Sequence, residues 1–162
     1  MLFKNLLKDP KKFVDDRGSV EILYENGNTV FKRTVTKAGV LRGMHYQKPP
    51  YEQTKIFRVI SGKILDFVTM PFDDDDYILG KEFTSEDGWI HIDSNLAHGF
   101  YSSEETVFEY FCDGAYNESE EITLRIDALL EKQLFIKDIK LSSKDKKGKK
   151  INKKIKMLNR SI

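Results

Sequence analysis

Cysteine and histidine are scarce in this sequence of 162 residues. The single Cys112 excludes an internal disulfide and any zinc site built from several thiolates, and its strand-like surroundings indicate a small core residue. Metal sites in β-barrels usually need two or three imidazoles, commonly as His-x-His on one strand face. The three histidines are His45, His91 and His98, and the residue two positions after His45 is Gln47. The sequence therefore predicts no metal site.

Long hydrophobic runs and an excess of one charge are absent as well. No segment approaches the roughly 20 apolar residues of a membrane-spanning helix, and residues 1–10 lack the apolar core and small-residue cleavage site of a signal peptide. We therefore expect a cytoplasmic protein. The 27 Lys+Arg and 26 Asp+Glu residues leave a net charge of +1, which favours neither nucleic acid nor an acidic membrane as a partner. Any anion must be bound locally.

The pattern of the remaining residues indicates an all-β fold. Short segments rich in β-branched and aromatic residues alternate with turn residues, which is typical of an antiparallel sandwich or barrel. The expected strands are 19–24, 29–36, 55–60, 64–70, 80–84, 88–92 and 106–112. Asn26-Gly27 predicts a hairpin between the first two of them. Residues 119–130 could form either a strand or a short helical turn.

Two charged segments stand apart from this pattern. Asp73–Asp76 is interpreted as a solvated turn, because consecutive carboxylates cannot converge on a cation as the alternating ligands of an EF-hand do. From Lys137 onward the sequence is rich in lysine, which would suit an RNA-binding arm, but no aromatic residue for base stacking interrupts the lysines. We therefore predict one domain over residues 1–140 and a solvated, partly disordered tail over 141–162 that packs partly on it.

The residues most suited to chemistry gather between positions 42 and 58. Strand alternation places His45 and Gln47 on one face, and Lys55 opens a strand that reads as buried. A hydrogen-bonded core histidine is the plain alternative for His45, but it does not explain Lys55, since lysine is rarely buried without a partner or a function. With Arg42 and Arg58 nearby, the spacing predicts a cation-rich pocket inside a β-barrel.

Three other residues do not by themselves indicate a function. Arg17 follows two aspartates at a turn, Tyr116 lies in a loop, and His91 reads as an ordinary strand residue.

The segment Arg42-Gly43-Met44-His45-Tyr46-Gln47, followed by Lys55-Ile56-Phe57-Arg58, resembles the signature of the dTDP-4-dehydrorhamnose 3,5-epimerase family, which reads Arg-Gly-x-His-x-Gln and then Lys-x-x-Arg. Four further pieces follow in the family's order. They are Asp16-Arg17-Gly18, Ala97-His98-Gly99-Phe100, Tyr116 ahead of a Glu pair with Asp127 beyond it, and Leu141-Ser142-Ser143-Lys144-Asp145. The resemblance extends over about residues 13 to 145.

This resemblance implies a cupin-like jelly roll with a short, mixed C-terminal segment, assembled as a homodimer that exchanges N-terminal strands. It implies a cofactor-independent epimerase that inverts C3, C5 or both in a 4-keto-6-deoxy hexose or heptose linked to dTDP or GDP, for surface carbohydrate biosynthesis. The hydrogens at C3 and C5 are both α to the C4 ketone. Inversion therefore needs a base, a group that stabilises the enolate, and an acid on the opposite face.

The resemblance also assigns roles to individual residues. His45 would be the base, Asp145 would orient it, Lys55 would stabilise the enolate oxygen, and Tyr116 would deliver a proton from the other face. The positions expected to contact sugar or diphosphate are Arg17, Arg42, Gln47, Arg58 and His98.

Two other functions remain open at this stage. An NDP-sugar 3,4-ketoisomerase of the same fold ranks lower, because that branch tends to carry a further histidine where this chain has Gln47. A non-catalytic sugar-nucleotide binding module also ranks lower, because such a relic has no reason to keep His45, Lys55 and Tyr116 together.

Overall fold

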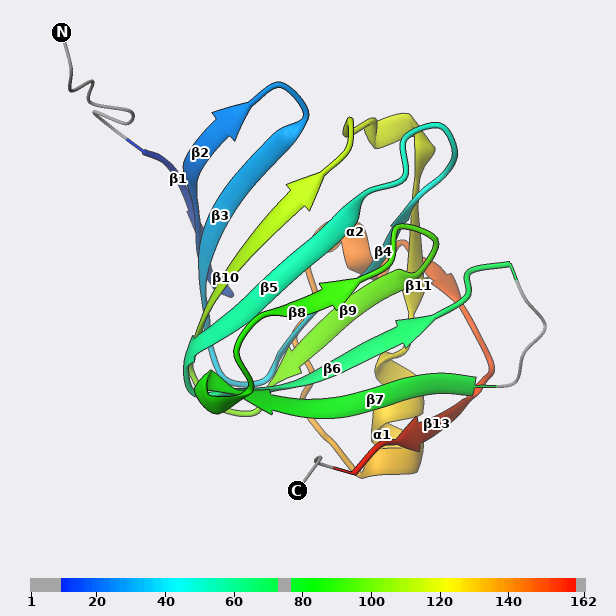
Figure 1. Ribbon diagram of the computed structural model, residues 1–162. Coiled ribbons are helices and arrows are strands. Elements are labelled where there is room, and N and C mark those ends of the chain that lie inside the picture. The colour runs from blue at the N-terminus through cyan, green and yellow to red at the C-terminus, as the bar shows by residue number, and fades with distance from the viewer. Residues whose placement is uncertain (1–9, 73–76, 160–162) are drawn as a thin grey trace, which may run out of the picture.

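The computed structural model describes residues 10–72 and 77–159, so the acidic run Asp73–Asp76, interpreted above as a turn, lies outside the described residues. Two curled sheets face each other (Figure 1). The first sheet has the order β1 (Lys11–Asp15), β2 (Gly18–Asn26), β3 (Thr29–Thr36), β10 (Thr106–Asp113), β5 (Thr54–Ser61) and β8 (Ile90–Ile92). The predicted all-β fold is confirmed.

The second sheet has the order β12 (Lys149–Lys150), β11 (Glu121–Arg125), β4 (Val40–Gln47), β9 (Ala97–Ser102), β6 (Lys63–Thr69), β7 (Tyr77–Thr84) and β13 (Lys154–Met157). The helical elements are η1 (Ser85–Asp87), η2 (Glu118–Glu120), α1 (Asp127–Leu134) and α2 (Ser143–Lys146). Residues 119–130 therefore form both of the alternatives left open, a strand followed by a helix. None of the helices in the described ranges is long and apolar enough to cross a bilayer.

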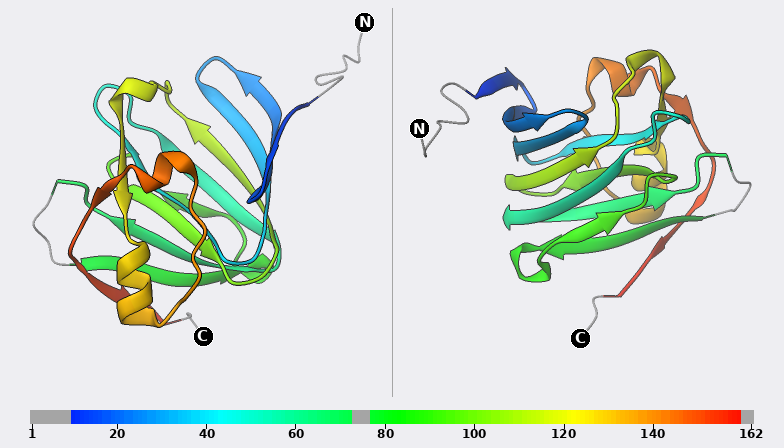
Figure 2. Two further views of the ribbon diagram at one scale, coloured as in Figure 1. Left: turned by 180° about the vertical axis from the view of Figure 1, so that it is seen from behind. Right: turned by 45° about the horizontal axis from the view of Figure 1, so that its top comes forward.

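The two faces of the second sheet are both covered. Its inner face meets the first sheet through an aromatic cluster that includes Phe57, Phe100 and Phe108. Its outer face is covered by α1 and the C-terminal segment, as the left view of Figure 2 shows, and Leu130 of α1 is fully buried there. Because both faces are covered, every residue of β4 is buried or half-buried, with no exposed positions in alternation. The few polar residues of β4 are therefore conspicuous.

The predicted hairpin at Asn26-Gly27 is confirmed. β2 and β3 pair antiparallel with Asn26 opposite Thr29, which leaves Gly27 and Asn28 as the two loop residues. Gly27 has φ 56°, a conformation that glycine adopts without the steric cost that other residues meet.

The C-terminal segment differs from the expectation of a partly disordered tail. Residues 154–157 form β13, which pairs in parallel with β7, and Ile151, Ile155 and Met157 pack against the core. The sequence Lys154-Ile155-Lys156-Met157 alternates polar and apolar residues, which is the signal of a half-buried strand. The high lysine content concealed this period of two in the sequence analysis.

Candidate active site

A bulge in β4 brings Arg42 and His45 to the same side of the sheet. In a regular strand, residues three apart point to opposite faces. The pairing of β4 with β9 shifts register between Arg42 and His45, and both side chains line one cavity. Gly43 makes this possible because its φ is 95° and a Cβ there would meet the His98 carbonyl oxygen at 2.6 Å. A glycine inside a strand is the sequence signal of such a bulge.

Two adjoining cavities open among the inward-facing residues of both sheets, and they share His45, Lys55 and Tyr110. The first has an aromatic floor and two arginines, and its lining includes Arg17, Thr34, Arg42, Phe57, His98, Phe100 and Phe108. The second is more polar, and its lining includes Lys32, Gln47, Gln53, Cys112, Tyr116 and Glu121. The site thus combines an apolar surface with several cations.

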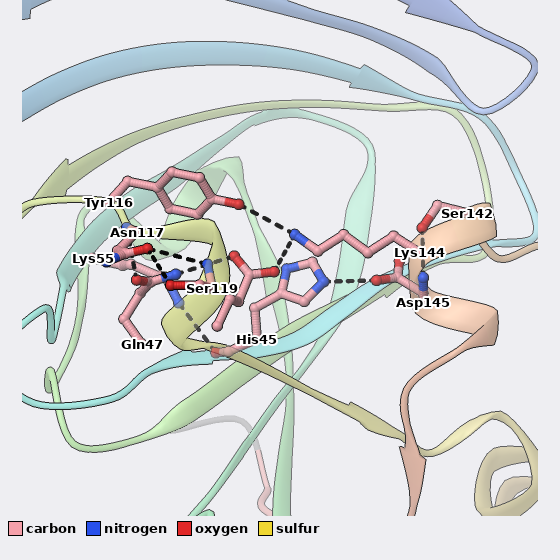
Figure 3. A network of polar contacts seen from close by, with 10 residues as sticks. His45, Gln47, Lys55, Tyr116, Asn117, Ser119, Ser142, Lys144 and Asp145 are labelled. Carbon is pink, nitrogen blue, oxygen red and sulfur yellow. Dashed lines mark hydrogen bonds and ion pairs between the residues drawn. The ribbon is translucent and has the colours of Figure 1, made fainter.

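His45 is hydrogen-bonded to Asp145, a residue 100 positions later in the chain, with 2.6 Å between His45 Nε2 and Asp145 Oδ1 (Figure 3). Asp145 is 2% exposed and lies in α2, where its backbone N–H donates to Ser142 Oγ at the helix start. Burial would raise the pKa of Asp145, but His45, Ser142 and the backbone of Gly43 together hold that pKa below its ordinary value. The carboxylate therefore stays charged beside the imidazole.

Lys55 lines both cavities and forms no ion pair with a carboxylate among residues 10–72 and 77–159, although the charges of Glu121 and Asp66 act on it. Its Nζ donates to the backbone oxygen of His45 at 3.4 Å. Burial lowers the pKa of the Lys55 ammonium below its usual range. An ammonium in this position is suited to bind an oxygen anion that enters the cavity.

Arg17 and Arg42 place two guanidiniums in the first cavity. Arg42 Nε donates to Thr36 Oγ1 at 3.0 Å, and no carboxylate within the described ranges pairs with Arg42. Burial and the nearby charge of Arg17 lower the pKa of Arg42. Arg17, from the turn between β1 and β2, is held by Asp15, with 2.5 Å between Arg17 Nη2 and Asp15 Oδ2. Asp15 neutralises one of these two neighbouring guanidiniums, so the pair keeps a net positive charge. Such a pair attracts an anion such as a diphosphate.

His98 forms a second histidine–carboxylate pair that the sequence analysis missed. His98 Nε2 lies 2.6 Å from Asp66 Oδ1, both side chains are buried, and the His98 ring stacks on Phe57. His98 pairs with His45 across β9 and β4, so the two imidazoles come from adjacent positions. The signal for Asp66 was a single acidic residue inside the apolar run Ile64–Thr69.

Tyr116 lies at the open side of the second cavity, half exposed, and its hydroxyl accepts a hydrogen bond from Lys144 at 3.4 Å. Gln47 supports the segment that carries Tyr116, because Gln47 Oε1 accepts from the Asn117 N–H at 3.0 Å while Gln47 Nε2 donates to Glu121 at 3.3 Å (Figure 3). Gln47, expected to contact substrate, therefore also has a supporting role. Lys144 and Glu121 were not predicted from the sequence to be part of the site.

The structure does not bring Arg58 to the site, and this corrects the expectation that it contacts substrate. Lys55 and Phe57 face inward from β5, so Arg58 points to the outer face of the first sheet. There it donates to Glu109 Oε2 at 3.0 and 3.2 Å and lies over the Trp89 ring.

Cys112 and His91 were interpreted as a core residue and an ordinary strand residue, and the structure agrees in part. Cys112 is buried, as expected of a core residue, but it also lines the second cavity. His91 is exposed on β8 beside Asp93, away from both cavities.

Comparison with known proteins places the chain in a family. The sequence profile described as dTDP-4-dehydrorhamnose 3,5-epimerase matches residues 4–153. The chain belongs to the dTDP-4-dehydrorhamnose 3,5-epimerase family.

Three members show how far the similarity extends. A dTDP-4-dehydrorhamnose 3,5-epimerase of Mycobacterium tuberculosis is 31% identical over 98 residues, which are 56% of this chain and 48% of that protein, so the match spans about half of the relative's length. The crystal structure of the epimerase from Elizabethkingia anophelis is 28% identical with a TM-score of 0.65, covering 93% of this chain and 96% of that one. This likeness confirms the cupin-like architecture.

A third structure contains a ligand. It is the dTDP-6-deoxy-D-glucose-3,5-epimerase of Legionella pneumophila in complex with dTDP-4-keto-L-rhamnose, which is 26% identical with a TM-score of 0.59 and covers 86% of this chain and 84% of that one.

Proposed function

We propose that this protein epimerises a dTDP-linked 4-keto-6-deoxy sugar at C3 and C5. The observation that carries the proposal is the joint placement of the His45–Asp145 pair and the unpaired Lys55 ammonium on one cavity. Family membership and the nucleotide sugar bound by the Legionella relative support it. Proton transfer next to a ketone requires this combination of base and enolate stabiliser.

His45 is the base in this proposal. Because Nε2 is hydrogen-bonded to the Asp145 carboxylate, that nitrogen keeps its proton and Nδ1 has the lone pair that can accept one. The charged carboxylate then stabilises the imidazolium that forms. Removal of the C3 or C5 proton moves its electron pair into a new C=C bond and places negative charge on the C4 oxygen.

Lys55 stabilises this oxygen. Burial removes water from its ammonium, and no carboxylate in the described part of the chain forms an ion pair with it, although the charges of Glu121 and Asp66 act on it. An enolate oxygen that enters the cavity can therefore take the place next to the ammonium. Electrostatic support of a developing charge in a dry site is usually the largest single contribution to such catalysis. Tyr116 then protonates the carbon from the other face, and the C4 ketone re-forms.

The residues proposed to bind substrate fall into two sets, the arginines and the remaining polar residues. We propose that Arg17 and Arg42 hold the diphosphate, because their forks pair with phosphate oxygens, whereas His98 and Gln47 contact the sugar. The reaction as written needs no cofactor, since it moves protons without a net change of oxidation state. The test below uses the dTDP-linked sugar and its GDP counterpart, so that it also identifies the nucleotide.

We also propose a homodimer. The outer face of the first sheet carries the Arg33–Glu109–Arg58 ion pairs, in which Glu109 is 3% exposed, next to the half-exposed Trp89. The edge strand β1 is exposed along its whole length, including Phe13 and Val14, and is available to pair with a second copy (Figure 2). Light scattering should give twice the chain mass, and a deletion of residues 1–16 should reduce it to the monomer.

The test of the activity is proton NMR of the protein with dTDP-4-keto-6-deoxyglucose, and with its GDP counterpart, in deuterium oxide. Loss of the C3 and C5 proton signals together with the appearance of the inverted sugar is expected, and it should disappear in H45A but not in the matched control H91A. No exchange by folded protein would contradict the proposal. Migration of the ketone from C4 to C3 would instead identify a ketoisomerase.

A further inference from the structure

The short helix α2 brings two consecutive residues into the site. Asp145 reaches His45, and Lys144 reaches the hydroxyl of Tyr116, as the dashed contacts of Figure 3 show. One turn of helix therefore contacts both groups that handle protons in the proposed reaction. The role of Asp145 is already part of that proposal, whereas Lys144 has none.

The Lys144 ammonium lies between two groups of the second cavity. Its Nζ donates to the Tyr116 hydroxyl at 3.4 Å and is 5.9 Å from the centre of the Tyr116 ring. It also forms an ion pair with Glu121, whose side chain is 8% exposed. The Glu121 oxygen in that pair has no other partner among the described residues, while the second oxygen accepts from Gln47.

This arrangement sets the charge around the phenol. Burial and the Glu121 carboxylate both raise the pKa of Tyr116, and the Lys144 ammonium opposes them. Without Lys144, a phenolate at Tyr116 would face a buried carboxylate with no cation between them. The tyrosine would then be a poorer acid and would give up its proton more slowly.

We propose that Lys144 is a positioning residue for Tyr116, which holds the phenol at the cavity and compensates the phenolate formed when Tyr116 gives up its proton. This inference rests on the proposed function. In the step concerned, the Tyr116 O–H bond breaks and its electron pair stays on oxygen, while the enolate C=C pair forms the new C–H bond and the C4 ketone returns. The Lys144 side chain is 45% exposed, so water can then return a proton to the phenolate.

A simpler role for Lys144 would be to tie α2 to β11 through Glu121. Such a structural link would affect stability but not the ionisation of Tyr116 once the charge of Glu121 is removed. The two roles can therefore be separated by a measurement on the unliganded protein, which does not depend on the substrate being correct.

The first experiment is a pH titration of protein labelled with carbon-13 at the tyrosine Cζ, followed by NMR, with Y116F to assign the signal. K144M should raise the pKa of Tyr116, and K144R should keep it near the wild-type value. K146M, which removes an equal charge from an exposed position of the same helix, should leave it unchanged. An unaltered Tyr116 titration in folded K144M would overturn the inference.

The double variant E121Q/K144M removes the carboxylate as well as the cation. A Tyr116 pKa that is higher in the double variant than in E121Q alone supports a direct action of Lys144 on the phenol. Equal Tyr116 pKa values in E121Q and E121Q/K144M would overturn the inference, because Lys144 would then act only by neutralising Glu121.

The second experiment uses turnover. In deuterium oxide, K144M should keep the exchange that depends on His45, while kcat for inversion falls about tenfold with little change in KM. The ratio of inversion to exchange should therefore fall. Y116F should show the same pattern more strongly, and K144R should recover most of the ratio. An equal loss of exchange and inversion would overturn the inference. A wild-type protein with no exchange at all would contradict the proposed function, and the titration would still decide the role of Lys144.

Discussion

Two histidine–carboxylate pairs lie side by side in this protein and differ in their surroundings. His45–Asp145 and His98–Asp66 have the same separation of 2.6 Å, and the two histidines are partners across β4 and β9. His45 is 32% exposed, whereas His98 is 8% exposed. The pKa of Asp145 is lowered and that of Asp66 is raised. Geometry alone therefore does not make a catalytic pair.

The difference comes from what else each carboxylate contacts. Asp145 sits at the start of α2, where Ser142 and the Gly43 backbone add hydrogen bonds to that of His45 and outweigh the cost of burial. Asp66 is fully enclosed, and burial outweighs the charge and hydrogen bond of His98. Asp145 can support a charged imidazolium at neutral pH, whereas Asp66 is suited to a structural hydrogen bond that fixes the His98 ring.

Replacement of the histidines should give the largest difference in kinetics between the two pairs. H45N should lower kcat by about a thousandfold, because a general base commonly contributes 10² to 10⁴. H98N should mainly raise KM, because His98 holds substrate in our proposal. Steady-state kinetics of both variants, with H91N as the control for an exposed histidine, would measure this. Equal losses of kcat in H45N and H98N would contradict the assignment of the base.

Replacement of the carboxylates should give the same ranking with smaller effects. D145N should lower kcat by about a hundredfold because the imidazolium loses its counter-charge, and D66N should lower it less. The measurement is kcat at pH 7 with circular dichroism to check folding. A larger loss of kcat in D66N would show that the buried pair is the catalytic one.

A substitution at Gly43 tests the bulge that places the two histidines side by side. G43A places a Cβ within 2.6 Å of the His98 carbonyl oxygen at a φ of 95°, so we expect a loss of about 2 kcal/mol in the free energy of unfolding. Urea unfolding of G43A beside G27A tests this, because Gly27 also has a positive φ but open space around its Cβ. A smaller loss in G43A than in G27A would refute the steric argument.

The pH dependence of stability should differ in sign between the two carboxylates, and this is the smallest effect. The folded pKa of Asp145 is lowered, so its contribution is complete above the unfolded value of about 3.9 and is lost as pH falls through the lower folded value. The folded pKa of Asp66 is raised, so its contribution is present below about 3.9 and is lost as pH rises through the higher folded value.

Urea unfolding of the wild type, D145N and D66N between pH 3 and 8 measures these contributions. The stability advantage of the wild type over D145N should shrink toward acid pH. Its advantage over D66N should shrink toward neutral pH. Parallel curves for the two differences would mean that the surroundings of the two carboxylates are equivalent, against the contrast described above.

The predictions from sequence were most successful where the signal is local. Alternating apolar residues and Asn26-Gly27 mark strands and a hairpin because side-chain direction and turn geometry depend on neighbours in the chain. Lys55 was noticeable because an ammonium in an apolar strand is costly to bury. Arg58 was misplaced even though it lies three residues away, since the side of the sheet that faces the cavity is not visible in the motif itself.

For the lysine-rich C-terminal segment, the prediction of a disordered tail was wrong because it relied on composition. Its composition suggested a solvated tail, yet the alternation Lys154-Ile155-Lys156-Met157 places apolar residues on the core. Composition counts charges, whereas burial depends on the period at which the apolar residues recur.

The sequence by itself determined the all-β fold and three central residues of the site, Arg42, His45 and Lys55, because these lie within one short motif. The resemblance already assigned Asp145 to His45, whereas only the tertiary structure showed that Asp66 pairs with His98 and how the surroundings of the two pairs differ. Asp145 comes from a position 100 residues after His45, and Asp66 from a neighbouring strand of the same sheet. Burial and additional hydrogen bonds give these two aspartates opposite pKa shifts, and both are properties of the folded surroundings rather than of the residue type.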